Sequence, residues 1–202
     1  MSSILRMAGP SPFARKVRIA ASVLGLDGDM TLDPSNTMDE SDSIRAQNPL
    51  GKIPALILDD GRVLYDSRVI VEYLDAMAGG GKLIPTNIDA RMETLRLQSL
   101  ADGIADAAVL IVYESRYRPD QEPFEPWLAH QRGKIERALS ALEAAPPPID
   151  PLYVGAIAVA CALGYLDFRK QVDWRSLNPG LISWADDFAA AVPSHFETHP
   201  DA

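Results

Sequence analysis

The spacing of apolar residues alternates between two patterns in the first 78 residues. Short apolar runs such as "SILRM", "ALIL" and "VLY" are typical of strands. Elsewhere apolar residues recur about every three or four positions, which is typical of an amphipathic helix. The predicted strands cover residues 3–7, 29–32, 55–58 and 63–65, and the predicted helices cover residues 13–24 and 67–77. This order predicts a small mixed sheet that carries helices.

Glycines mark the predicted turns of this first part. Gly25 or Gly28 ends the first helical pattern. Gly61 follows an aspartate between two apolar runs, and an Asp-Gly pair in that position is a strong hairpin signal. The polar, acidic segment 35–49 is predicted to be a loop with a short helical turn.

Beyond residue 78 the strand patterns disappear. Three successive glycines, residues 79–81, open a predicted linker over residues 79–87. Helical patterns follow over residues 90–118, 124–145, 152–168 and 179–191. The third of these is apolar on nearly every face, which indicates a helix in the middle of a bundle. We therefore expect an α/β domain over residues 1–78 and an all-α helical domain over residues 88–202.

Composition narrows the function classes. The chain has 202 residues and a net charge of −9, which argues against non-specific nucleic-acid binding but leaves room for a local anion site. The single cysteine, Cys161, excludes an internal disulfide and a CxxC pair, and its apolar helix predicts an inert buried thiol. No apolar run reaches the roughly 18 residues of a membrane helix, and no signal pattern opens the chain. We expect a cytoplasmic protein without a membrane partner.

Ser11 begins the first helical pattern, and Pro12 follows it. This pair is typical of a helix N-cap followed by proline at the first helical position. The three histidines, His130, His195 and His199, all lie in the second half of the chain, and no GxSxG motif occurs. The residues therefore argue against a serine hydrolase, and on its own Ser11 is predicted to be a helix cap.

Three segments together carry a family resemblance. They are "SPFARKVRIA" after the first strand, "NPLGKIPALILDDGRVLYDSRVIVEYL" from Asn48 to Leu74, and "IAVACALGYLDFR" from Ile157 to Arg169. In this order the chain resembles the cytosolic glutathione S-transferases, specifically bacterial serine-type members, over essentially its whole length. The resemblance implies a thioredoxin-like N-terminal domain, an all-helical C-terminal domain, glutathione as co-substrate without a metal, and a homodimer.

The resemblance assigns roles to residues of the first domain. Ser11 would donate a hydrogen bond to the glutathione thiolate, and Phe13 would belong either to the core, which its spacing favours, or to the wall of the site. A cis peptide before Pro54 would turn Ile53 toward the cysteinyl backbone of glutathione. Lys52 would bind the glycyl carboxylate, or would simply be solvated as a loop lysine often is. Ser67 would bind the γ-glutamyl carboxylate, and Asp66 would lie near the γ-glutamyl ammonium; Asp66 and Ser67 also fit a helix cap.

A second substrate would sit between the two domains. Tyr113, Arg116 and Tyr117 have the spacing i, i+3, i+4, so they share a helix face that would either line an electrophile pocket or serve packing. Arg15 and Arg18 would add positive potential to the thiol site or remain solvated. Trp127 receives no role.

The chain departs from the family pattern at two places. Tyr153 and Ala156 stand where many members carry a capping box at the start of the central helix, so Asp150 with Pro151 is the expected substitute. The "SPF" segment has neither tyrosine nor cysteine, which disfavours reductase chemistry. The expected activity is conjugation of small hydrophobic electrophiles, as in detoxification. The alternatives are a non-catalytic binding or regulatory protein similar to the stringent starvation proteins, and a glutathione-dependent isomerase or peroxidase.

Overall fold

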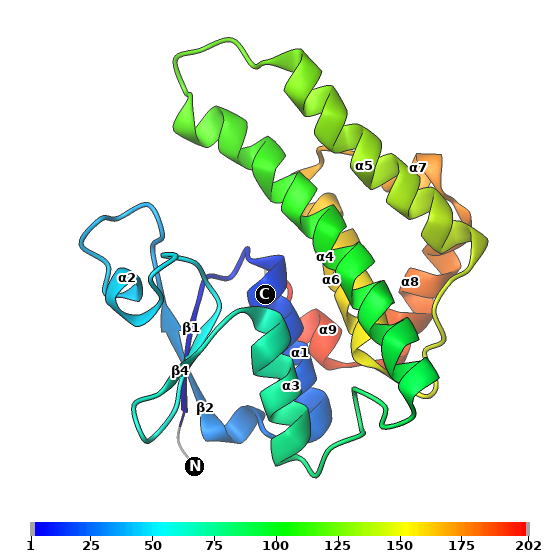
Figure 1. The fold of residues 1–202 in the computed structure, drawn as a ribbon. Helices are drawn as coiled ribbons and strands as arrows, with labels where there is room; N and C mark the ends of the chain where they lie inside the picture. The colour runs from blue at the N-terminus through cyan, green and yellow to red at the C-terminus, as the bar shows by residue number, and fades with distance from the viewer. Residues whose placement is uncertain (1–2, 201–202) are drawn as a thin grey trace.

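The computed structural model describes residues 3–200, and its first part is a four-stranded sheet (Figure 1). The strands are β1 (Ser3–Met7), β2 (Met30–Pro34), β3 (Ala55–Ile57) and β4 (Val63–Leu64). Their order in the sheet is β2-β1-β3-β4, with β1 and β2 parallel and the other pairs antiparallel. The predicted mixed sheet is confirmed, and the fold is the expected α/β thioredoxin-like one.

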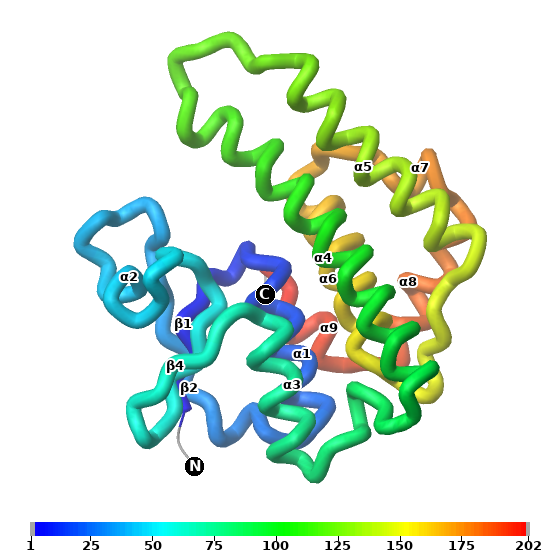
Figure 2. Tube along the Cα trace, viewed as in Figure 1, coloured from blue at the N-terminus to red at the C-terminus, as the bar shows by residue number. Residues whose placement is uncertain are grey.

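The helices α1 (Pro12–Leu24) and α3 (Ser67–Met77) lie side by side between the sheet and the rest of the molecule (Figures 1 and 2). A single turn, η1 (Asp27–Asp29), leads from α1 to β2, and α2 (Ile44–Gln47) is the short helical turn expected in the acidic segment. Gly25 ends α1 with a φ of 72°, and Gly61 has a φ of 83° in the hairpin between β3 and β4. Both conformations suit glycine, because it has no Cβ to clash.

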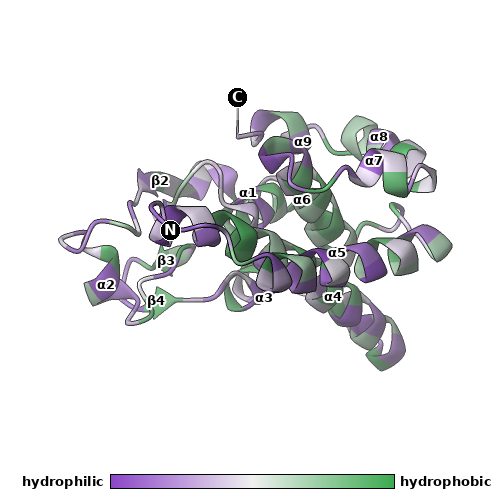
Figure 3. Ribbon diagram, turned by 90° about the horizontal axis from the view of Figure 1, so that it is seen from above, coloured by the Kyte–Doolittle hydropathy of each residue, from purple (hydrophilic) through white to green (hydrophobic). Residues whose placement is uncertain are grey.

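The second part is all helical. Its elements are α4 (Ile88–Tyr117), α5 (Glu125–Ala144), α6 (Val154–Arg169), α7 (Trp174–Leu177), α8 (Gly180–Ala191) and α9 (Ser194–Glu197). α4 and α5 form a long pair that projects beyond the sheet, and α6 lies behind α4 (Figure 1). α6 is apolar on all sides and buried along most of its length, as its sequence predicts (Figure 3). No described helix is long and apolar enough to cross a membrane.

The cap of α6 corrects one expectation. Asp150 and Pro151 do not cap the helix, which begins three residues later, after Tyr153. Instead the Gly155 N–H donates to the Thr94 hydroxyl at 3.0 Å, and the Val154 N–H donates to a carbonyl of the linker segment at 3.0 Å. The first turn of α6 is therefore satisfied by α4 and the linker, which no local sequence pattern at residues 150–156 reveals.

The end of the chain adds two short helices, α7 and α9, that the apolar pattern does not predict. α9 packs on α1, so the described C-terminal residues return to the first part of the fold. One apolar core runs from the sheet through α1 into α4, α6 and α8. This shared core fixes the position of the α/β part relative to the helices.

Candidate functional site

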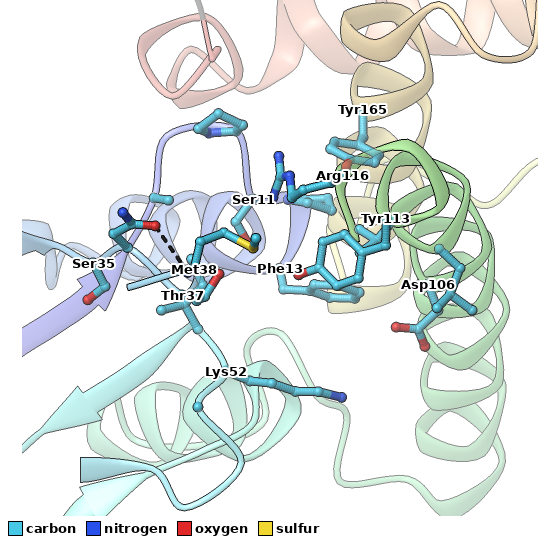
Figure 4. Close-up of a pocket in the computed structure, with 18 of the residues that line it drawn as sticks. Ser11, Phe13, Ser35, Thr37, Met38, Lys52, Asp106, Tyr113, Arg116 and Tyr165 are labelled. Carbon is cyan, nitrogen blue, oxygen red and sulfur yellow. Dashed lines mark hydrogen bonds between the residues drawn. The ribbon is translucent and has the colours of Figure 1, made fainter. Parts of the chain in front are cut away.

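Two adjoining cavities lie where the loops of the α/β part face α4 and α6. The larger has a volume of about 610 Å³ and the smaller about 320 Å³. Four residues line both of them: Phe13, Lys52, Ile53 and Asp106. Figure 4 shows the larger cavity with the loop of Thr37 and Met38 on one side and Tyr113 and Tyr165 on the other.

Ser11 lines the larger cavity at the start of α1. It is the N-cap residue, with extended backbone, and its hydroxyl accepts a hydrogen bond from the Ala14 N–H at 3.2 Å. Within residues 3–200 this hydroxyl donates no hydrogen bond, so its proton is available to a ligand. The cap predicted from the sequence is confirmed, and the cap geometry leaves the donor free.

Ile53 and Pro54 provide a backbone edge next to Ser11. The peptide bond between them is cis, as expected from the resemblance. Ile53 lines both cavities, and within the described chain its N–H and C=O form no hydrogen bond. A free N–H and C=O on one residue can pair with an extended peptide in the manner of an added strand.

Asp66 and Ser67 line the smaller cavity at the start of α3. Asp66 is the N-cap: its carboxylate accepts from the Arg68 N–H at 2.9 Å, and the Tyr65–Asp66 peptide is cis. Ser67 is the first residue of the helix and is 2% exposed. The start of α3 therefore presents a hydroxyl and the positive end of the helix dipole to the cavity, an arrangement suited to a carboxylate.

Phe13 and Lys52 lie at the boundary between the two cavities and line both of them. Phe13 is half-buried and forms part of the wall, which corrects the preference for a core position. Its apolar spacing could not distinguish the two, because a cleft wall and a core look alike in sequence. Lys52 extends from the loop before β3 toward the space between the walls (Figure 4).

A buried ion pair underlies the site. The Lys16 ammonium, on a side chain 1% exposed, lies 2.6 Å and 2.9 Å from the two carboxylate oxygens of Asp102 on α4. The Arg68 guanidinium donates to the same carboxylate at 3.0 Å. This cluster joins α1, α3 and α4 directly beneath the smaller cavity, which Arg68 and Asp102 line.

Asp106, one turn beyond Asp102 on α4, faces both cavities. Partial desolvation in the cleft raises its pKa, and repulsion from Asp102 adds to the rise, while Lys52 and Arg68 oppose it. Asp106 was not among the residues expected at the site. Its helical spacing from Asp102 is visible in the sequence, but its approach to Lys52 depends on tertiary packing.

The helical wall is formed by α4 and α6. Tyr113 and Arg116 line the larger cavity as their spacing suggests, and Tyr165 and Arg169 of α6 join them. Tyr117 does not line either cavity: it is 56% exposed and its ring lies edge-on to Tyr113, with centroids 5.1 Å apart. It shares a face with Tyr113 but sits one helical turn closer to the end of α4, beyond the rim.

The loop that follows β2 closes the opposite side. Residues 35–38 line the larger cavity, and the Met38 N–H donates to the Asn36 side-chain oxygen at 3.0 Å (Figure 4). Arg6, 5% exposed on β1, holds this loop in place. It donates to Ser35 at 2.8 Å, Ser43 at 2.7 Å, Gln47 at 2.7 Å and Asp42 at 2.9 Å. The sequence does contain one sign of this network, because an arginine within a largely apolar strand needs polar partners when it is buried.

Several other candidates lie outside the cavities. Arg15 is 2% exposed and its guanidinium donates to the His195 carbonyl at 2.6 Å, while Arg18 donates to the Glu197 carbonyl at 3.4 Å. Both arginines therefore serve α9 rather than the thiol site. Trp127 is 38% exposed on α5. Cys161 is 2% exposed, and burial raises its pKa to about 11, as befits an inert thiol.

Two family models and a curated relative match the sequence of this chain. Residues 10–77 match the family model "Glutathione S-transferase, N-terminal domain", and residues 125–187 match "Glutathione S-transferase, C-terminal domain". The chain is 34% identical over 184 residues to the uncharacterized GST-like protein YibF of Escherichia coli K12, covering 88% of this chain and 89% of that protein.

Two solved structures of similar proteins contain glutathione. A glutathione transferase family member from Pseudomonas fluorescens Pf-5, with bound glutathione, is 43% identical with a TM-score of 0.91, over 98% of this chain and 99% of that one. A glutathione S-transferase from Methylobacillus flagellatus KT, with GSH bound, is 38% identical with a TM-score of 0.88, over 98% and 100%. The chain thus belongs to the glutathione S-transferase family.

Proposed function

We propose that this protein is a glutathione transferase that joins the glutathione thiolate to small electrophiles. The observation that carries the proposal is the Ser11 hydroxyl, which lines the cavity and donates no hydrogen bond within residues 3–200, together with the Ile53 backbone, which is likewise unpaired among these residues. In this proposal residues 1–78 bind glutathione, residues 79–87 link the parts, residues 88–202 complete the electrophile pocket, and the protein is a cytoplasmic homodimer.

Each part of glutathione finds a chemically suitable group. The cysteinyl backbone pairs with Ile53 at the edge that the cis peptide to Pro54 exposes. The γ-glutamyl carboxylate binds at the start of α3 with the Ser67 hydroxyl, and Asp66 attracts the γ-glutamyl ammonium. Lys52 binds the glycyl carboxylate, and Phe13 packs against the tripeptide.

Ser11 then raises the fraction of reactive thiolate. A cysteine thiol has a pKa near 8.5, so only about 3% is ionised at pH 7. Lowering that pKa by about two units requires roughly 2.7 kcal/mol in favour of the anion. A hydrogen bond to a charged acceptor contributes about 1.5–3 kcal/mol, and the N-terminus of α1 adds about 0.3–1 kcal/mol. The two contributions together reach the required size.

The reaction needs no nucleophile from the protein. The thiol proton leaves to solvent, the sulfur lone pair attacks the electrophilic carbon, and a carbon–sulfur bond forms. In a substitution the leaving group departs with its bonding electrons. In an addition to an activated alkene, solvent protonates the neighbouring carbon. Ser11 keeps its proton throughout and acts only as a hydrogen-bond donor.

Substitutions at Ser11 test this role, because the cap and the donor can be separated. Ser11→Ala removes both, Ser11→Asp keeps a capping oxygen without a proton, and Ser11→Thr keeps both. We expect Ser11→Ala and Ser11→Asp to lower kcat/KM for an aryl halide at pH 6.5 by about 10- to 100-fold, and Ser11→Thr to retain most activity. In Ser11→Ala the pH profile shifts upward as the thiol pKa returns toward its ordinary value.

Ser22→Ala, at the other end of α1, is the matched control and should leave the profile unchanged. Calorimetry should show that Ser11→Ala still binds glutathione. If the kcat/KM of Ser11→Ala for the aryl halide equals that of the wild type across pH 6–8, Ser11 acts only as a helix cap. If the protein neither binds glutathione nor forms conjugates, yet captures a defined partner, the non-catalytic alternative is supported. If it isomerises a substrate or reduces a peroxide without conjugation, the isomerase or peroxidase alternative is supported.

A further inference from the structure

The helical wall of the larger cavity carries two arginines that have no carboxylate partner in the described part of the chain. Arg116 and Arg169 line the cavity, and neither forms an ion pair with a carboxylate of residues 3–200. The Arg116 guanidinium lies 5.5 Å from the centroid of the Tyr113 ring, and that of Arg169 lies 5.4 Å from the Tyr165 ring. The other arginines that contact the cavities or their floor, such as Arg68, are paired.

Arg169 is incompletely satisfied even though it is well packed. Its Nε is buried and has no hydrogen-bond partner in the described chain. A buried donor without a partner costs free energy unless a ligand or water supplies the acceptor. Arg169 also lines the larger cavity, so this incompletely satisfied guanidinium belongs to the cavity wall.

The two arginines act on the same point. Burial raises the pKa of Tyr165, and the positive charges of both Arg169 and Arg116 oppose that rise. Tyr165 is 4% exposed, so the field of the pair is poorly screened there. Figure 4 shows Arg116, Tyr113 and Tyr165 gathered on the same side of the cavity.

The acidic group of the cavity lies elsewhere. Asp106 precedes Arg116 on α4 by about 15 Å at about 1.5 Å per residue, and the cations that act on it are Lys52 and Arg68. The charged side chains that line the larger cavity are otherwise cationic: Lys52, Arg116 and Arg169. A chain with a net charge of −9 thus has a positive end in its main cavity.

We propose that the electrophile taken by this cavity carries a carboxylate, which Arg116 and Arg169 bind; this proposal rests on the transferase function above. Of the groups assigned to glutathione, Pro54, Asp66 and Ser67 line only the smaller cavity, and Phe13, Lys52 and Ile53 line both. The two arginines line only the larger cavity, as does Ser11, which is assigned to the thiol. On α4, between Asp106 and Arg116, the wall of the larger cavity is apolar and is formed by Val109, Leu110 and Tyr113. The substrate therefore has an apolar or aromatic body, an electrophilic carbon toward Ser11 and a carboxylate toward Arg116 and Arg169.

A matched pair of electrophiles tests the charge preference. In a chlorodinitrobenzoate and in its methyl ester, the thiolate forms a carbon–sulfur bond at the ring carbon and chloride leaves with the bonding electrons. We expect the wild type to favour the benzoate by about tenfold in kcat/KM, after each rate is divided by the uncatalysed rate with glutathione, because hydrogen bonds between charged groups are among the strong ones.

Variants locate the preference. Arg116→Gln and Arg169→Gln keep a polar, hydrogen-bonding end group but shorten the side chain and remove its charge. Each should lower kcat/KM for the benzoate by about tenfold or more and change that for the ester by less than about twofold. Arg116→Lys and Arg169→Lys should keep part of the preference. Arg96→Gln, on the same helix in an exposed pair with Glu93, is the control and should change neither rate.

Binding gives a readout that does not require turnover. The conjugates of glutathione with the benzoate and with the ester are prepared chemically and titrated by calorimetry, together with free glutathione. The acid conjugate should bind about tenfold tighter to the wild type, and the two Gln variants should lose this difference while binding glutathione as before. Equal affinity for both conjugates would overturn the carboxylate proposal and leave the transferase function intact.

Two further outcomes would also overturn it. If the Gln variants weaken free glutathione as much as the acid conjugate, the arginines hold the co-substrate and not the electrophile. If the protein binds neither glutathione nor either conjugate, the transferase function fails, and the carboxylate proposal fails with it.

Discussion

The two walls of the cleft are built by different means. The wall from the α/β part uses backbone features at the ends of elements: the cap at Ser11, the cis peptide at Pro54 and the helix start at Ser67. The wall from α4 and α6 uses long side chains, with Arg116 and Arg169 drawn from helices far apart in sequence. The first kind of wall suits an invariant tripeptide, and the second is open to change by single substitutions.

Helix α1 holds the two walls together. Ser11 faces the cleft from its first turn, while Lys16 reaches α4 through Asp102 and Arg15 reaches α9 on the other side. The Lys16–Asp102 pair therefore adds a polar link between the walls to the apolar core that fixes their relative position, and Arg15 ties the same helix to α9. Substitutions in these contacts show how far the walls are independent.

The largest effect is expected for Asp102→Ala. It removes both oxygens that bind the Lys16 ammonium and leaves a charge 1% exposed without a partner, whereas Arg68 can turn to solvent. Breaking a buried pair in this way costs about 3–5 kcal/mol in the free energy of unfolding. Urea unfolding followed by circular dichroism measures the loss, provided that the slope stays constant.

Two controls make this result specific. The double variant Lys16→Met with Asp102→Leu removes both charges and should recover most of the lost stability. Glu93→Ala breaks an exposed pair on the same helix and should cost less than about 0.5 kcal/mol. A loss below about 1 kcal/mol for Asp102→Ala would mean that the pair does not join the walls.

The wall from the α/β part was largely predictable from the sequence. The strands, the cap at Ser11, the hairpin glycine and the cis peptide before Pro54 follow from short contiguous patterns, with the family resemblance supplying the last. Each of these features depends on neighbours within a few residues. The roles proposed for Ser11, Lys52 and Ser67 in binding remain predictions.

The helical wall was predictable only in part. Tyr113 and Arg116 were found because they share one helix face, but Tyr165 and Arg169 come from a helix whose packing no local pattern fixes. The same reason explains why Thr94 was missed as the cap of α6. Contacts of high sequence separation, such as that of Arg15 with α9, left no sign in the apolar spacing.

A second prediction tests whether the wall from the α/β part depends on contacts between residues distant in sequence. Arg6 on β1 fastens the segment of residues 35–47 through the side chains of Ser35, Asp42, Ser43 and Gln47, so Arg6→Met should loosen a part of the wall distant in sequence. We expect a loss of about 2–3 kcal/mol in unfolding free energy, because several hydrogen bonds to a charged donor disappear. Limited proteolysis with an unspecific protease should cut residues 35–47 faster.

Arg62→Met is the matched control, since Arg62 pairs with Asp60 in the exposed hairpin and should affect neither stability nor cleavage appreciably. Unchanged protection of residues 35–47 in Arg6→Met would show that this loop is held by its own turns. In that case the first wall would be as local as its sequence patterns suggest.

The smallest effect concerns the back of α1 and depends on pH. The Arg15 guanidinium lies 3.3 Å from the His195 Nδ1, and His199 and Asp167 also act on the ring. Burial, followed by repulsion from Arg15, lowers the pKa of His195 to about 4, from about 6.5 when unfolded. Between these values the unfolded state binds the additional proton, so stability falls as pH decreases from about 6.5 to about 4.

The variant His195→Gln isolates this contribution from that of the carboxylates. From pH 6.5 to pH 4 we expect the unfolding free energy of the wild type to fall by about 1–2 kcal/mol more than that of the variant. The difference is not larger because solvent screens the partly exposed ring. Above pH 7 the unfolding free energies of the two proteins should depend on pH in nearly the same way. His130→Gln is the matched control, because it removes a histidine on the exposed face of α5, away from α1 and α9. Parallel curves of unfolding free energy against pH for the wild type and His195→Gln would contradict this prediction. They would mean that α9 holds α1 through Arg15 and the backbone alone, and that protonation of His195 does not weaken the packing of α9 on α1.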